Sequence, residues 1–296
     1  MLKKCLRLSS IIAVSMAMMA CQTASHSMHY VPQKVIGLKT PESVVQAKDG
    51  RIFISEINGF GKDGDGQISV IDTQGKVSVF ATGLDDPKGL TIIANNLYVA
   101  DKTKIIKITP DGKPSVFVAT ENFPTLPFFL NDLEADPQGN LYVSDSGDLF
   151  NTGKGGAIYK ISPDGKVKLL INALQDTRIK APNGLLADDT GNVLLCVDFT
   201  SGVLYSLDTQ SGKLTDLATG FGGGDGLVHH SDGTMYVSDW KNGKVFGVNR
   251  AGDVKEIKSG YQSAADISLT KDEAYIMVPD MKAGELDFIP VSALSN

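Results

Sequence analysis

The strongest constraint on this chain is an internal repeat. A short motif recurs six times, and an acidic residue follows its first marker after 13 to 15 positions each time. The first markers are Glu42, Lys88, Asn131, Asn183, Asp225 and Ala265. The second markers are the acidic residues that follow them, Glu56, Asp101, Asp145, Asp198, Asp239 and Asp280. The acidic residues recur every 41 to 53 positions, and such self-similarity is typical of repeat folds, so we expect one closed array.

Each repeat contains four runs of apolar and β-branched residues separated by turns. In the third repeat, residues 141–143 and 158–161 lie on either side of the acidic residue, and Pro163-Asp164-Gly165 supplies a turn. The 31 glycines and 12 prolines of the chain fit many such turns. Four strands per period of this length are the signature of a propeller blade. We therefore predict an all-β fold, a six-bladed β-propeller with four-stranded antiparallel blades around a central channel.

This propeller is expected to form a single domain over residues 31–296. We place the blades at about 35–80, 81–117, 118–170, 171–217, 218–257 and 258–290. The third interval is the longest because residues 148–156 insert a glycine-rich loop. Residues 31–36 are expected to add a strand to the last blade and close the ring, which removes exposed strand edges.

Residues 1–20 have the features of a secretory signal peptide. A basic start precedes an apolar run that is too short for a transmembrane helix. The Met-Met-Ala sequence before Cys21 resembles a bacterial lipobox, so we expect a lipid on Cys21 and a tether over residues 21–30. The protein is then exported and anchored by this lipid to the bacterial outer membrane, or otherwise periplasmic. The alternative is an ordinary cleaved signal followed by an incidental cysteine.

Charge and cysteine content narrow the range of functions. The net charge is −6 at pH 7, without a stripe of Lys and Arg, which argues against a nucleic-acid partner. With the signal peptide removed and Cys21 lipidated, Cys196 is the one thiol left in the fold. Its apolar neighbours predict a buried small hydrophobic side chain rather than a nucleophile.

In a propeller, the first residue positions of the innermost strands meet around the channel. The six first markers therefore form one predicted ring. Two carboxylates and two amide side chains in this ring are oxygen ligands, which hard cations such as Ca²⁺ and Mg²⁺ prefer, whereas Zn²⁺ more often takes His or Cys. Alternatively, these polar residues hydrogen-bond one another and channel water in a structural propeller.

Several motifs in these repeats resemble the SMP-30/gluconolactonase/luciferin-regenerating enzyme-like family of six-bladed propellers. The resemblance covers residues 35–290, and its most specific pieces are Asn131-Asp132, Pro182-Asn183-Gly184 and Gly224-Asp225-Gly226. It implies that Glu42, Asn183 and Asp225 hold one divalent cation, Ca²⁺ first, with Mg²⁺, Mn²⁺ or Zn²⁺ as alternatives. It also implies that Asp225 is the catalytic base. Asn131 would contact the substrate or complete the surroundings of the metal.

The chain departs from the family pattern at the mouth of the channel. Phe129 stands where sugar lactonases have an arginine, and Phe123 and Phe128 are close in sequence. We therefore expect a lactone or ester less polar than gluconolactone. Lys88 is expected to stabilise the developing oxyanion or bind a substrate carboxylate, and an idle lysine at the rim is the alternative.

The sequence thus predicts a metal-dependent lactonase or esterase that acts on a small molecule. The alternative is a non-catalytic, NHL-like binding propeller for a protein or glycan partner, and a strictosidine-synthase-like propeller rests on fold analogy alone. The chain has no Gly-x-Ser-x-Gly and no His-Glu-x-x-His motif. A closed propeller needs no partner to fold, so we expect a monomer with no membrane contact beyond the lipid.

Overall fold

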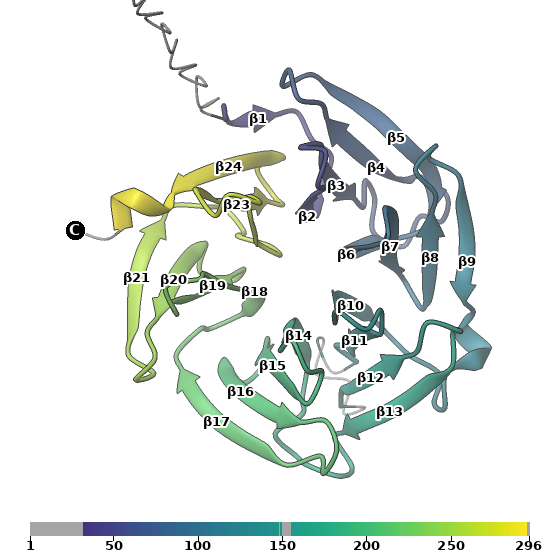
Figure 1. Ribbon diagram of the computed structural model, residues 1–296, viewed down its shortest axis with the longest axis vertical. Coiled ribbons are helices and arrows are strands. Elements are labelled where there is room, and N and C mark those ends of the chain that lie inside the picture. The colour runs from purple at the N-terminus through teal and green to yellow at the C-terminus, as the bar shows by residue number, and fades with distance from the viewer. Residues whose placement is uncertain (1–31, 148, 150–154, 295–296) are drawn as a thin grey trace, which may run out of the picture. The chain divides into compact units, whose positions relative to one another are not determined.

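Six four-stranded antiparallel sheets are arranged around a ring in the computed structural model of the protein (Figure 1). The structure describes residues 32–147, 149 and 155–294, which belong to the unit Pro32–Asn296. The predicted signal peptide, the lipidation site Cys21 and the tether lie outside the described residues. The predicted six-bladed propeller is confirmed.

In each of the first five blades, four consecutive strands run from the channel outward. Blade 1 comprises β2 (Pro41–Gln46), β3 (Ile52–Glu56), β4 (Gly66–Ile71) and β5 (Val77–Leu84). Blade 2 comprises β6 (Pro87–Ile93), β7 (Asn96–Asp101), β8 (Lys104–Ile108) and β9 (Pro114–Val118). Blade 3 comprises β10 (Leu130–Ala135), β11 (Leu141–Asp145), β12 (Ala157–Ile161) and β13 (Val167–Asn172). Blade 4 comprises β14 (Pro182–Ala187), β15 (Val193–Asp198), β16 (Val203–Asp208) and β17 (Leu214–Thr219). Blade 5 comprises β18 (Gly224–His229), β19 (Met235–Asp239), β20 (Lys244–Val248) and β21 (Val254–Ser259).

Blade 6 is assembled from both ends of the described chain. It comprises β22 (Ser268–Leu269), β23 (Tyr275–Asp280), β24 (Glu285–Pro290) and β1 (Val35–Ile36). β1 pairs antiparallel with β24, with Val35 opposite Leu286 (Figure 1). The predicted closing strand is therefore confirmed. The predicted limits of blade 1 are corrected, because residues 35–36 belong to blade 6 and β5 continues to Leu84.

The core lies between neighbouring blades, where the apolar faces of adjacent sheets pack together. One cluster joins Ile105 and Val118 of blade 2 to Leu130 and Val143 of blade 3. Cys196 is buried in the next cluster, between blades 3 and 4, as predicted. Because each sheet buries both faces against its neighbours, hydrophobic burial stabilises the ring as a whole.

The remaining elements are small. Two 3₁₀ helices, η1 (Thr120–Asn122) and η2 (Val291–Leu294), lie on the connections that follow β9 and β24. Within the described ranges, no helix has the length and apolar character needed to cross a membrane.

Candidate functional site

A β-bulge at the start of each of the first five inner strands aims a side chain into the channel. The pairing of β14 with β15 shows it: Pro182 pairs with Asp198 and Leu185 with Cys196, so Asn183 and Gly184 together face one residue, Val197. The same register shift occurs in blades 1, 2, 3 and 5. A bulge of this kind re-aims side chains, and in each blade it includes the first marker.

Five of the six first markers meet around one cavity of about 460 Å³. They are Glu42, Lys88, Asn131, Asn183 and Asp225, each only 1 to 4% exposed. The sixth, Ala265, does not line this cavity. It is buried in a small apolar cluster with Ile57 and Met281. The predicted ring therefore has five polar members and one apolar gap.

Four of these side chains each carry a buried oxygen atom without a hydrogen-bond partner. The atoms are Glu42 Oε2, Asn131 Oδ1, Asn183 Oδ1 and Asp225 Oδ1. An unpaired buried acceptor costs about 1–3 kcal/mol, and native folds rarely leave several of them together. The concentration of four such atoms around one cavity indicates a site that a ligand completes.

Local hydrogen bonds orient the amide of Asn131 so that its oxygen stays available. Asn131 Nδ2 donates to Ser146 Oγ at 3.1 Å, and Ser146 Oγ donates to the carbonyl of Pro182 at 2.7 Å. The amide nitrogen of Asn131 is therefore the paired atom, and its oxygen is left free. The side chain of Asn183 acts on Asp225 and lowers the pKa of that carboxyl group, against the larger effect of burial.

The two carboxyl groups are destabilised as anions by their surroundings. Burial is the main cause that raises the pKa of Glu42, and the charge of Asp225 adds to it. Burial and the nearby Asp132 raise the pKa of Asp225 in the same way. A cation among these oxygens would reverse both effects, because an opposite charge favours the ionised form.

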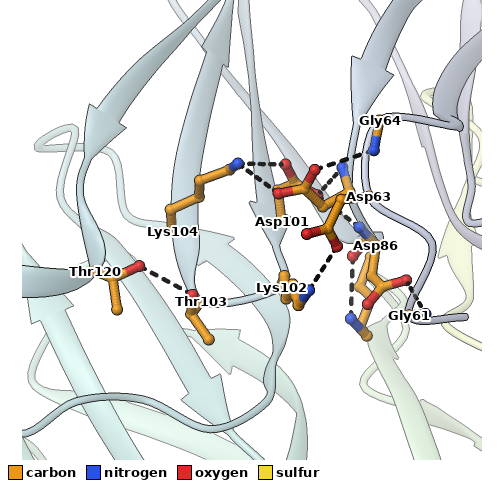
Figure 2. A network of polar contacts seen from close by, with 11 residues as sticks. Gly61, Asp63, Gly64, Asp86, Asp101, Lys102, Thr103, Lys104 and Thr120 are labelled. Carbon is orange, nitrogen blue, oxygen red and sulfur yellow. Dashed lines mark hydrogen bonds and ion pairs between the residues drawn. The ribbon is translucent and has the colours of Figure 1, made fainter.

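Lys88 is held inside the channel rather than at the rim. Its Nζ donates to the carbonyl of Asp86 at 3.0 Å and lies 4.3 Å from the centre of the Phe129 ring. The Asp86 N–H is in turn held by Asp101 Oδ1 at 2.9 Å (Figure 2). Burial lowers the pKa of Lys88, and the charge of Glu42 opposes that shift.

The same network fixes the loop between β3 and β4, which carries Phe60 at the mouth. Gly61 N–H donates to Asp86 Oδ1 at 3.1 Å, and Lys102 Nζ lies 2.5 Å from Asp63 Oδ1 (Figure 2). Phe60 lines the cavity while remaining 56% exposed. This loop therefore forms part of the entrance.

The second markers have a structural role that the sequence analysis did not assign. In blade 4, Asp198 Oδ2 accepts the N–H groups of Lys180 and Ala181 at 3.0 and 2.8 Å. Its Oδ1 accepts those of Thr200 and Ser201. Every other second marker likewise accepts at least one loop N–H just ahead of the inner strand of its own blade. These carboxylates hold the loops that position the first markers.

The walls of the cavity are mostly apolar. Besides the five polar residues, the lining includes Ile57, Phe60, Phe129, Leu149, Phe199, Trp240, Lys241 and Met281. Ile57, Phe199, Trp240 and Met281 each directly follow a second marker, so the repeat itself contained the signal that the sequence analysis missed. The prediction for Phe123 was wrong. It is buried between blades and packs on Tyr159 with ring centres 5.2 Å apart.

The donor set is suited to a hard cation. Among the described residues, no group of three or more His, Cys, Asp or Glu side chains could hold a metal ion. A cation in this channel would therefore depend on the amide oxygens of Asn131 and Asn183 as well as on the two carboxylates. Amide and carboxylate oxygens are ligands for Ca²⁺ or Mg²⁺, and the unpaired atoms fit such an ion.

Solved structures with low sequence identity share this fold. A structural-genomics protein provisionally assigned as a gluconolactonase has a TM-score of 0.69 and 17% identity, over 87% of this chain and 90% of that one. Virginiamycin B lyase from Staphylococcus aureus has a TM-score of 0.59 and 16% identity, over 88% of each chain. A chain of a nidogen/laminin complex has a TM-score of 0.61 and 21% identity, over 76% of this chain and 82% of that one.

Sequence comparison is more specific. No curated protein matches the chain. The profile of the SMP-30/Gluconolactonase/LRE-like region, however, matches residues 91–276, which is more than half of the sequence. This match includes three of the five polar channel residues, Asn131, Asn183 and Asp225, and leaves out Glu42 and Lys88. On this match and the six-bladed fold, the chain belongs to the SMP-30/gluconolactonase/LRE-like family.

Proposed function

We propose that this protein is a divalent-metal-dependent hydrolase of a lactone or ester, with its site in the central channel. The observation that carries the proposal is the set of four buried oxygens without partners around one cavity. Membership of a family named for gluconolactonase agrees with lactonase-like chemistry.

In this proposal Glu42, Asn183 and Asp225 hold the cation, with Asn131 beside it or on the substrate. Ca²⁺ is the first choice because the donors are all oxygens, with Mg²⁺, Mn²⁺ and Zn²⁺ as alternatives. When bound, such an ion supplies polarisation of the substrate carbonyl and a lower pKa for water.

The side chains of the channel supply the remaining functions. Asp225 is the proposed base as well as a ligand of the cation, and its carboxylate would accept the proton from the attacking water. Lys88 Nζ, which donates to the Asp86 carbonyl, would stabilise negative charge that develops on the carbonyl oxygen of the substrate. Because Phe129, Phe199 and Trp240 line the walls, the cavity excludes water from an apolar acyl or aryl group. The proposed substrate is therefore less polar than a sugar lactone.

The test measures metal content and hydrolysis together. The purified protein would be assayed on sugar, aliphatic and aryl lactones, before and after chelation, beside Asp225→Asn and Glu42→Gln. Both variants are expected to lose the bound metal and to lower kcat/KM by about 10³-fold, the scale of a lost general base or metal. Asp253→Asn, at an exposed residue directly before the outer strand β21, is the matched control and should keep both.

A folded protein that binds no divalent cation and hydrolyses nothing beyond its variants would exclude this proposal. That result would leave the non-catalytic binding propeller as the better account. Export and lipid anchoring at Cys21 are proposed with the enzyme, and they are independent of the chemistry in the channel.

A further inference from the structure

Blades 4, 5 and 6 place two lysines on aromatic rings at the mouth of the cavity. Phe199 follows β15 and Trp240 follows β19, and their ring centres are 6.0 Å apart. Lys241 Nζ lies 4.4 Å from the centre of the Phe199 ring and donates to the Phe199 carbonyl at 3.3 Å. Lys282 Nζ lies 4.1 Å from the centre of the Trp240 ring. The aromatic wall thus carries two ammonium groups.

These ammonium groups differ in pairing from those of blade 2. Lys102 forms an ion pair with Asp63 at 2.5 Å, and Lys104 forms one with Asp85 at 2.7 Å. In the part of the chain that the structure describes, no carboxylate lies within 4.0 Å of the ammonium of Lys241 or Lys282. Neither ammonium group therefore belongs to an ion pair among the described residues.

The position of Lys241 is also fixed by packing. Its side chain occupies the space beside Gly223, where an added Cβ would come within 2.6 Å of Lys241 Cγ. The aliphatic part of the side chain is thus held against the blade 4–5 loop while its ammonium faces the Phe199 ring. A cation held in place at the edge of an apolar cavity is a recognition element for an anion.

We infer that the substrate is amphiphilic, with an apolar body and an anionic group at the end away from the reacting carbonyl. The apolar body would lie along Phe199, Trp240 and Met281, and the anionic group would meet Lys241 and Lys282. This inference rests on the proposed hydrolase for the reacting end of the molecule. It assigns Lys241 and Lys282 as specificity-determining residues that take no part in bond breaking.

The test compares two substrates that differ only in charge. One is dihydrocoumarin with a carboxylate on its aromatic ring, and the other is the corresponding carboxamide. The protein should prefer the carboxylate, and the preference should decrease with added salt because exposed charges are screened. Lys241→Met and Lys282→Met each keep the aliphatic packing and should lower kcat/KM for the carboxylate by about fivefold to tenfold, mainly through KM. The carboxamide should be unaffected.

Two controls separate charge from structure. Lys241→Arg keeps the charge and should keep most of the preference. Lys102→Met removes a lysine that is already paired with Asp63 and should leave the preference unchanged. Equal kcat/KM for carboxylate and carboxamide, or a preference that survives the double Lys241→Met, Lys282→Met variant, would overturn the inference while the hydrolase proposal stood.

A binding measurement keeps the inference testable without catalysis. Trp240 is the one tryptophan of the chain and lines the cavity, so its fluorescence reports on ligands there. Titration with 3-phenylpropanoate should change this fluorescence, the neutral 3-phenylpropanamide should bind more weakly, and both lysine variants should remove the difference. If that pattern held in a protein without hydrolytic activity, the hydrolase proposal would fail and the anion site would remain. Equal binding of acid and amide would count against the anion site.

Discussion

Two rings of buried polar residues, the first markers on the inner strands and the second markers at the ends of the next strands, differ in how their hydrogen bonds are filled. Each second marker accepts at least one backbone N–H group, and Asp198 accepts four. The first markers Glu42, Asn131, Asn183 and Asp225 each leave an oxygen without a partner. Both rings are almost fully buried. Among the second markers, Asp101 Oδ2 is also without a hydrogen-bond partner, but it lies 3.6 Å from Lys104 Nζ. Burial alone therefore does not distinguish a structural polar residue from a functional one, whereas several unpaired oxygens around one cavity do.

The difference has a physical origin. A carboxylate that accepts N–H groups from a loop exchanges its water for fixed donors, so it stabilises the fold. A carboxylate or amide with an unpaired oxygen has lost water without replacement, which is a cost to the fold. Such a cost persists in a native protein where a ligand or reaction offsets it. On this interpretation Asp198 stabilises its blade, and Asp225 belongs to the proposed ligand site in the channel.

The largest expected effect is on stability, and it comes from removing the carboxylate of one second marker. Asp198→Ala leaves four loop N–H groups without an acceptor and should lower the free energy of unfolding by about 4 kcal/mol. Urea denaturation measures this loss. Asp208→Ala is the matched control, because Asp208 accepts two similar turn N–H groups but is exposed, and its loss should stay below about 1 kcal/mol. Similar losses for both would remove the distinction between the rings.

The next largest effect is the pH dependence of stability that the first markers in the channel, here called the channel ring, should cause. Burial raises the pKa of Glu42 and Asp225 in the folded, metal-free protein, while the unfolded chain ionises them near their ordinary values of about 4. Above that pH the folded state retains protons that the unfolded state has released, so the stability of the chelated protein should fall as pH rises from about 4 toward 8. Thermal denaturation in a chelator at several pH values measures the trend.

A divalent cation should reverse this loss of stability with rising pH. At a free concentration about 100 times Kd, Ca²⁺ should add about 2.7 kcal/mol to the free energy of unfolding at pH 7 to 8. Asp225→Asn should flatten the pH dependence and weaken the response to Ca²⁺. The prediction would be contradicted if the chelated wild-type protein became more stable as pH rose from about 4 toward 8. The carboxyl groups of the channel ring would then not be the buried, unpaired groups described above.

The smallest expected effect tests a single satisfied hydroxyl. Ser238 Oγ accepts the N–H of Gly226 and donates to the carbonyl of Ala265, both at 2.7 Å. Ser238→Ala should therefore cost about 1.5 kcal/mol of unfolding free energy and leave the metal affinity unchanged. Ser115→Ala, at an exposed hydroxyl, is the control. A change in metal affinity with no loss of stability would move Ser238 from the structural group to the functional one.

Much of the architecture could be predicted because the repeat is set by geometry. The distance from Asn183 to Asp198 is fixed by one bulged hairpin, so the same spacing recurs wherever that hairpin does. The closing strand at Val35 followed from the expectation that a closed ring leaves no exposed strand edge. The position of Asp225 in the channel followed from its equivalence to the other first markers.

Other features depend on contacts that spacing does not encode. The role of Asp198 lies in loop N–H groups, which every residue except proline has and which no side-chain pattern reveals. Lys88 has a chain long enough for the rim or the channel, and the Asp86 carbonyl and Phe129 ring decide between them. Phe123 precedes a loop near the mouth, but its packing on Tyr159 takes it into the core.

The pairing of β1 with β24 forms the seam that closes the ring, and it also affects how fast the protein folds and which part of it opens first. β1 contributes two residue pairs to blade 6, and these join positions about 250 residues apart in the sequence. Contacts of such long range slow folding, because the chain loses its freedom before they form. Ile36 is 72% exposed, so the seam buries little apolar area and should be the first to exchange its amide hydrogens. Blade 6 also meets the channel through Asp266, whose N–H binds the Glu42 carbonyl at 2.9 Å. A ligand held by Glu42 should therefore slow hydrogen exchange at a seam it does not touch.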